Sequence, residues 1–184
     1  MSPHFPLRAS PTTSPWVRAM ADQAFSRAAS AQFVEGNTIT LLKDAAQNYT
    51  AWLKAMERST SWIHFQNYFI TNDRTGRTFA DVLAEKARQG IRVRLIYDWL
   101  GSLGRASGRF WDRLRDSGVE IRCFNPPRID EPFGWIVRNH RKSITVDGRT
   151  GFVSGLCVGE AWEGDPARGI EPWRDTGVAI TGPA

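Results

Sequence analysis

The sequence predicts an α/β fold, an α-β-α sandwich built on a mostly parallel mixed sheet. Three observations predict this fold class. Segments with strand character alternate with segments of helical periodicity between residues 38 and 124. A tight-turn dipeptide flanked by short strand segments follows, which predicts a hairpin. The chain of 184 residues is 41% hydrophobic and 23% charged, which suffices for one domain with a sizeable core.

The first predicted elements are a short strand at residues 38–42 and a helix at residues 44–58. The helix is predicted because apolar residues recur with a helical period, at Ala46, Tyr49, Leu53 and Met56. Residues 62–70 follow as a strand. This segment is apolar on both faces, as a central buried strand is, so we expect its His64 to lie in the core.

The next helix is predicted to begin near Thr78, because Thr78 and Asp81 have the spacing of a capping box. Gly90 is expected to end it, since glycine commonly follows the last turn of a helix. Between them the helix has one apolar face, formed by Phe79, Leu83 and Ala87.

The alternation continues with a strand at residues 91–97, a short helix at residues 110–118 and a strand at residues 119–124. Strands that alternate with helices at this spacing favour βαβ units and a sheet covered on both faces. Residues 125–133 contain three prolines and are predicted to form a loop.

The alternation of strand and helix segments ends after this loop. Asp147-Gly148, a dipeptide favoured in tight hairpin turns, stands between strand segments at residues 143–146 and 152–153. A last strand is predicted at residues 176–180.

Residues 1–36 are interpreted as an N-terminal extension that is partly mobile, because the first 14 residues are rich in Pro, Ser and Thr. Residues 37–184 are interpreted as the folded domain. No apolar run approaches the roughly 18 residues of a membrane-spanning helix, and no secretory signal is evident. Two cysteines, Cys123 and Cys157, give no disulfide framework and fit a reducing, cytoplasmic compartment.

The net charge is +5, and twenty of the 24 basic residues are arginine. Arginine binds phosphate groups through two parallel hydrogen bonds, which favours an anionic partner. A solvated surface with a compositional preference for arginine explains the same numbers. Net charge alone does not distinguish nucleic acid from anionic lipid.

The most informative stretch is His140-Arg141-Lys142-Ser143-Ile144-Thr145-Val146-Asp147, which reads H-x-K-x4-D. Residues two apart on an extended segment point to the same face, so His140 and Lys142 are predicted to act together. His140 is the candidate nucleophile toward a phosphodiester, forming a phosphohistidine intermediate. Lys142 is the candidate cation that neutralises the phosphoryl oxygens. This chemistry requires no metal or cofactor, and none is expected.

The motif and its surroundings resemble the phospholipase D superfamily, and within it the N-terminal half of bacterial cardiolipin synthase-like proteins. The resemblance covers about residues 37–184 and includes Tyr68-Phe69-Ile70-Thr71-Asn72-Asp73, Tyr97-Asp98-Trp99-Leu100-Gly101-Ser102, Phe152-Val153-Ser154-Gly155-Leu156 and Trp173-Arg174-Asp175-Thr176-Gly177. It implies a phospholipase D-like fold, no cofactor, and a place at the inner membrane as a peripheral protein bound to anionic phospholipid.

The resemblance also implies further site residues. Asp175 matches an acidic position of the superfamily and is the candidate for orienting His140, with Glu160 as the alternative. Asp147 completes the motif, but it lies seven residues from His140 in a turn, which favours a structural role. Ser154 and Gly155 are candidates for binding phosphoryl oxygens, because Cys157 replaces the asparagine usual in relatives.

Two more residues are predicted to bind substrate. Arg105 lies in a loop at 101–105 that resembles a phosphate loop, and it is expected to bind an anionic head group. Trp135 belongs to the apolar segment 133–137, interpreted as a loop that contacts the membrane.

Superfamily enzymes combine two H-x-K motifs in one site, and this chain has one. A second motif is therefore expected either from a missing C-terminal half, favoured because the sequence stops abruptly at Ala184, or from a second subunit. Three functions follow as hypotheses. The first is phosphatidyl transfer or phospholipase D-type chemistry on anionic phospholipid. The others are a homodimeric endonuclease of the same superfamily and a catalytically inactive half-domain.

Overall fold

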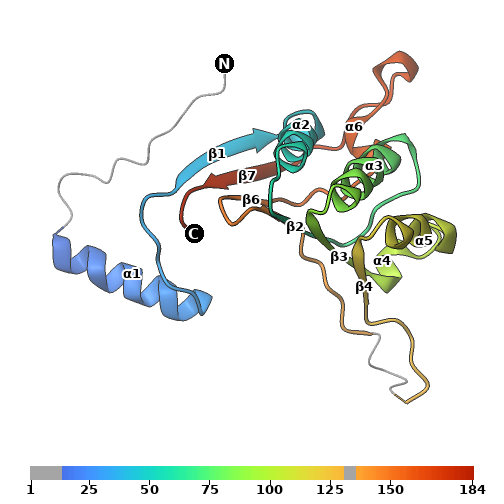
Figure 1. The fold of residues 1–184 in the computed structure, drawn as a ribbon. Coiled ribbons are helices and arrows are strands. Elements are labelled where there is room, and N and C mark those ends of the chain that lie inside the picture. The colour runs from blue at the N-terminus through green and yellow to red at the C-terminus, as the bar shows by residue number, and fades with distance from the viewer. Residues whose placement is uncertain (1–13, 131–135) are drawn as a thin grey trace.

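The structure is a computed structural model and describes residues 14–130 and 136–184. In these residues seven strands form one sheet in the order β1-β7-β6-β5-β2-β3-β4 (Figure 1). The strands are β1 (Thr38–Lys43), β2 (Trp62–Asn67), β3 (Arg92–Asp98), β4 (Glu120–Phe124), β5 (Ser143–Val146), β6 (Thr150–Val153) and β7 (Thr176–Thr181).

Three helices form a layer on one face of this sheet (Figure 1): α2 (Asp44–Glu57), α3 (Arg74–Arg88) and α5 (Gly108–Asp116). The core lies between this layer and the alternate residues of the strands. Its largest fully buried side chains include Trp52, Phe65, Phe79, Leu95 and Leu114. The predicted α/β class and the order of its elements are therefore confirmed.

The sheet differs from the expected one in two respects. Only the β2–β3 and β3–β4 pairings are parallel, and the other four are antiparallel, so the sheet is mixed but not mostly parallel. In the described residues the face opposite the helices carries exposed side chains, so the sheet has a helical layer on one side. The prediction for His64 was wrong. It is exposed on this open face, with its ring 4.4 Å from that of Trp62.

Helix α3 begins earlier than predicted, because Asp73 rather than Thr78 caps it. The Asp73 Oδ1 accepts a hydrogen bond of 2.8 Å from the Gly76 amide. Asp73 also accepts a bond of 2.9 Å from the Glu160 amide, so this cap ties α3 to a distant loop. Gly90 has a φ of 85° directly after the helix, the left-handed conformation that the prediction required.

The N-terminal extension contains a helix that the sequence reading missed. Helix α1 (Pro15–Ala29) has no buried residue and lies apart from the sheet in Figure 1. The rest of the predicted mobile tail, residues 1–13, lies outside the described residues. Three short elements complete the fold: α4 (Trp99–Ser102), α6 (Glu160–Glu163) and the 3-10 helix η2 (Pro166–Arg168). No helix in the described residues is long and apolar enough to cross a membrane.

Candidate functional site

The sheet topology brings the two halves of the chain together at one edge of the sheet, where the ends of several strands meet. Strands β2 and β3 are parallel and end at this edge, and β5 is antiparallel to β2, with Ser143 opposite Gln66. Strand β6 ends beside the start of β5, where Val153 is opposite Ser143, and β7 begins here as well. Residues that precede β5 and β7 therefore meet residues that follow β2, β3 and β6.

His140 and Lys142 meet at this edge, as their spacing predicted. The Lys142 Nζ lies 3.1 Å from the His140 Nδ1 and donates a 2.8 Å hydrogen bond to the His140 carbonyl oxygen. Tyr68, which follows β2, packs against both residues. Its ring lies 4.6 Å from the imidazole and 5.2 Å from the Lys142 ammonium, a cation–π distance. His140 itself is exposed, whereas Lys142 is only 7% exposed.

Asp98 holds the segment that leads to His140, and sequence reasoning missed this role. Its fully buried carboxylate accepts hydrogen bonds of 3.0 Å from Arg138 Nη1 and 2.9 Å from the Asn139 amide. It also accepts one of 3.1 Å from the Gly101 amide. The carboxylate thus joins the end of β3 to the residues directly before His140. An acidic residue at the end of a buried strand was the available signal.

Burial governs the electrostatics around Lys142. Desolvation lowers the pKa of its ammonium below 10.5, while the nearby Cys157 and Asp175 favour the charged form. Burial also raises the pKa of the Cys157 thiol. The Cys157 carbonyl oxygen accepts a 2.5 Å hydrogen bond from the Tyr49 hydroxyl of α2. That bond, together with one of 3.3 Å from the Gly159 amide to Tyr49, fixes the loop after β6.

Asp175 lies at the same edge, next to Gly155. A side-chain carbon added at Gly155 would collide with the Asp175 carboxylate, so the glycine makes room for it. Asp175 Oδ1 accepts a 2.6 Å hydrogen bond from the Thr176 amide. Its carbonyl oxygen accepts a 2.8 Å hydrogen bond from the amide of Asp44, the first residue of α2, and its amide donates one of 3.0 Å to the Asp44 Oδ1. In the described residues no hydrogen bond joins Asp175 to His140.

The other predicted site residues are placed as follows. Ser154 Oγ accepts a 3.2 Å hydrogen bond from the Leu156 amide, and the Ser154 amide donates to the Lys142 carbonyl oxygen. The Arg105 guanidinium lies 4.2 Å from the centre of the Phe69 ring, at the end of β2. Glu160, the alternative to Asp175, forms an ion pair with Arg74 instead. Trp135 lies outside the described residues.

Asp147 lies at the other end of β5, away from His140. It adopts a φ of 53° and Gly148 one of 64°, which makes the predicted tight turn. Its carboxylate accepts hydrogen bonds from the Ser59 hydroxyl (2.9 Å) and from the amides of residues 60 (2.8 Å), 61 (2.9 Å) and 62 (2.8 Å). These bonds outweigh desolvation and lower the pKa of Asp147 to about 2. The geometry therefore fits the structural interpretation of Asp147, and a catalytic role for it stays an untested prediction.

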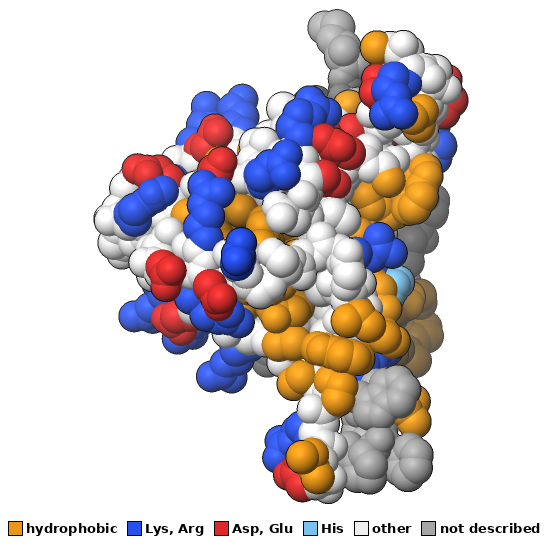
Figure 2. Space-filling view, turned by 90° about the vertical axis from the view of Figure 1, so that its right-hand side faces the viewer, with side chains coloured by type: hydrophobic (Ala, Val, Ile, Leu, Met, Phe, Trp, Pro, Cys, Tyr) orange, Lys and Arg blue, Asp and Glu red, His pale blue; other side chains and the backbone are white. Residues whose placement is uncertain are grey.

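Large hydrophobic side chains are exposed on the loops around the site. They lie in or directly after α4, in the segment before His140 and in the segment before Asp175, and they are Leu100, Leu103, Ile136, Val137 and Trp173. Figure 2 shows hydrophobic side chains gathered on one part of the molecular face that it views, beside a histidine. Among the described residues no group of three or more His, Cys, Asp and Glu side chains is arranged to hold a metal ion.

The comparisons with known proteins identify the family. The family model described as "Cardiolipin synthase, PLD-like domain" matches residues 52–158, more than half of the chain. The chain belongs to this phospholipase D-like family. Among curated relatives, the "Probable cardiolipin synthase YwiE" of Bacillus subtilis is 37% identical over 85% of this chain. The "Major cardiolipin synthase ClsA" of the same organism is 34% identical over 84%.

The chain corresponds to only part of these relatives. It spans 31% of the length of the first and 32% of the second. Among solved structures, the phospholipase D family member Nuc from Salmonella typhimurium matches with a TM-score of 0.60 at 19% identity, over 80% of this chain and 86% of Nuc. A phosphatidylserine synthase from Haemophilus influenzae matches with a TM-score of 0.52 at 14% identity, over 83% of this chain and 36% of the synthase. These likenesses support the phospholipase D-like fold.

Proposed function

We propose that this chain carries the nucleophile-bearing half of a phosphatidyltransferase of the cardiolipin synthase type, acting on anionic phospholipid. The observation that carries the proposal is the pair of His140 and Lys142. Their side chains lie 3.1 Å apart at an edge of the sheet, the histidine exposed and the lysine buried. The curated relatives, named as cardiolipin synthases, support the choice of phospholipid over other phosphodiesters.

In the proposed first step a ring nitrogen of His140 attacks phosphorus. A nitrogen–phosphorus bond forms, the bond to the leaving alkoxide breaks, and a phosphohistidine remains. A charged Lys142 donates its hydrogen bond to the Nδ1 lone pair in the present arrangement. The ammonium must therefore turn to the non-bridging oxygens as the substrate enters. This movement frees the ring and places a positive charge where negative charge develops.

The second step is attack on the phosphohistidine by an alcohol or water. An oxygen–phosphorus bond forms, the nitrogen–phosphorus bond breaks and His140 is restored, while the attacking hydroxyl gives its proton to the group that protonated the leaving alkoxide. The leaving alkoxide needs a proton, and we assign that role to a second H-x-K motif outside this chain, in the rest of a longer protein or in a second subunit. His64 does not fit this role, because it lies on the open face of β2 with its ring 4.4 Å from that of Trp62. The Asp175 carboxylate is proposed to accept a hydrogen bond from the protonated ring nitrogen of His140 once Lys142 has turned to the phosphate.

The substrate is proposed to be taken from a membrane surface. The exposed hydrophobic side chains on the loops around the site would contact the acyl region, while Arg105 and Lys142 would face the phosphate. This division fits a peripheral protein at the inner membrane that draws a lipid head group into its site.

Trapping of the intermediate tests the proposal. The chain, supplied with a half that carries a second H-x-K motif, is mixed with short-chain phosphatidylglycerol labelled at phosphorus. Label that stays on the protein is assayed for the acid lability of phosphohistidine. Light scattering on the same sample gives the molar mass. We expect label on His140 in the wild type and none in His140→Asn, because loss of a covalent nucleophile costs several orders of magnitude. Labelling of the variant above about 1% of wild type would exclude His140 as the nucleophile.

The alternatives give different results in the same assays. A dimer that nicks plasmid DNA and leaves the lipid unchanged would favour the endonuclease hypothesis. A protein in which His140→Asn changes no measured property would favour the inactive half-domain, provided that a half carrying a second H-x-K motif has been supplied.

A further inference from the structure

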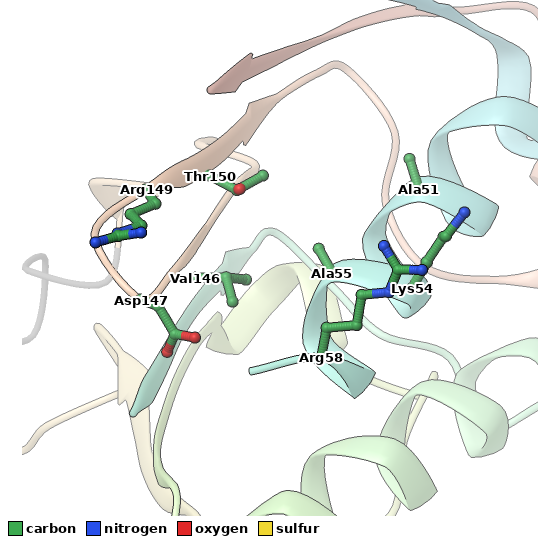
Figure 3. A pocket seen from close by; sticks show the side chains of 8 residues that line it. All are labelled: Ala51, Lys54, Ala55, Arg58, Val146, Asp147, Arg149 and Thr150. Atoms are coloured by element: carbon green, nitrogen blue, oxygen red, sulfur yellow. The ribbon is translucent and has the colours of Figure 1, made fainter. Parts of the chain in front are cut away.

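A second cleft lies at the end of β5 opposite to His140. It has a volume of about 380 Å³ and lies between the last turns of α2 and the β5–β6 hairpin. Figure 3 shows Ala51, Lys54, Ala55 and Arg58 on the helix side and Val146, Asp147, Arg149 and Thr150 on the hairpin side. Seven residues of largely extended chain separate Asp147 from His140, a span of up to about 23 Å.

Three cations line the cleft: Lys54 and Arg58 from α2, and Arg149 from the hairpin. All three are exposed. None forms an ion pair with an acidic side chain within the part of the chain that the structure describes. Other basic residues of this protein do have such partners, for example Arg94 with Glu120 and Arg113 with Asp81.

Asp147 is the acidic residue that lines the cleft, and the described residues show no ion pair between it and these cations. Both of its carboxylate oxygens accept hydrogen bonds from residues 59–62, so its acceptor sites are already occupied. With three positive charges and one negative charge, the lining has a net charge of +2. The cations remain available for a ligand that brings negative charge.

The rest of the lining restricts the kind of anion. Ala51, Ala55 and Val146 supply an apolar wall of small side chains, and Thr150 adds a hydroxyl group. The volume accommodates a phosphate together with a few carbon atoms. Guanidinium and ammonium groups bind phosphate oxygens through charge-assisted hydrogen bonds, which are stronger than those between neutral groups.

We propose that the cleft formed by Lys54, Arg58 and Arg149 is a second anion site, which binds a phosphate ester such as a glycerol phosphate. This chemistry is shared by a free phosphorylated polyol and by the head group of an anionic phospholipid. The site is separate from the His140 edge and does not depend on the reaction proposed there. It gives the protein a place to hold a phosphate that is not being attacked.

Binding measurements test this site without any turnover. The full chain carrying Lys142→Met, which removes the cation beside His140, is titrated by calorimetry with inorganic phosphate and with glycerol 3-phosphate. Co-sedimentation with vesicles of phosphatidylglycerol, compared with phosphatidylcholine, probes the lipid source. The cleft variant is Lys54→Ala/Arg58→Ala/Arg149→Ala. The control variant is Arg92→Ala/Arg109→Ala/Arg122→Ala, which removes the same charge from exposed positions outside the cleft.

We expect the cleft variant to bind roughly tenfold or more weakly than its parent, and the control to bind within about twofold of it. A difference with glycerol 3-phosphate indicates a free phosphate ester, and a difference with anionic vesicles alone indicates a lipid head group. An equal loss of binding in the cleft variant and the control variant would show that only the net charge matters, and it would overturn the site. The site would also be overturned if the parent bound none of the probes. Arg149→Gln in the hairpin turn serves if the triple variant fails to fold, and a partial loss is then expected.

Discussion

Replacing Asp147 by asparagine removes a negative charge from a carboxylate that accepts four hydrogen bonds of 2.8–2.9 Å from residues 59–62. These bonds connect the hairpin turn to the start of β2. Asparagine tolerates the left-handed φ of 53°, so the backbone of the turn should survive. The change therefore measures how much the negative charge of Asp147 contributes to the stability of the fold. It also separates a structural Asp147 from a catalytic one, because a structural residue costs stability and leaves the labelling of His140 intact.

The magnitude follows from the pKa. The folded value of about 2 lies below the ordinary 3.8, a difference that corresponds to about 2 kcal/mol of stability at neutral pH. Because the folded pKa is lowered, this stability is present above pH 3.8 and is lost as the pH falls through the folded pKa. The contribution should be nearly complete at pH 5 and should fall to about half at pH 3.

Urea unfolding at pH 7, 5 and 3 measures this effect. We expect Asp147→Asn to be about 2 kcal/mol less stable than wild type at pH 7 and 5, with a smaller gap at pH 3. The control is Asp116→Asn, an exposed carboxylate on α5, which should change stability by less than about 0.5 kcal/mol. A gap that stays constant down to pH 3, or an Asp147 variant as stable as wild type, would refute the reasoning.

Three further predictions concern the His140 edge. Asp98→Asn leaves the guanidinium of Arg138 without its buried partner and should cost about 3 kcal/mol in urea unfolding; a cost below about 1 kcal/mol would contradict the positioning role. Gly155→Ala displaces the adjacent Asp175 carboxylate, so the rate of phosphohistidine formation should fall about tenfold or more. The control Gly108→Ala, whose added carbon meets no atom within 4 Å, should leave this rate unchanged. Burial lowers the pKa of Lys142, so this rate should decline with rising pH before pH 10.5; a rate that is flat up to that pH would argue against the lysine as the phosphate-binding cation.

Much of the fold followed from local patterns. Helical periodicity placed α2, and the alternation of apolar residues placed β3 with Val93, Leu95 and Tyr97 buried. The pairing of His140 with Lys142 also followed, because side chains two apart on an extended segment share a face whatever the rest of the fold does. The conformation of Asp147 and Gly148 in the turn is likewise a local preference.

The site required long-range pairing, which local patterns do not contain. The antiparallel register of β5 on β2 brings Tyr68 to His140. The hydrogen-bond partners of the buried Asp98, Arg138 and Asn139, come from about forty positions later in the chain, so no local pattern predicts them. The exposure of His64 was also decided by packing, since a strand with apolar neighbours is buried on both faces only if a second layer covers it. The second cleft depends on the same physics. Three cations that lie up to about a hundred positions apart in the sequence line one cleft, because α2 packs beside the β5–β6 hairpin.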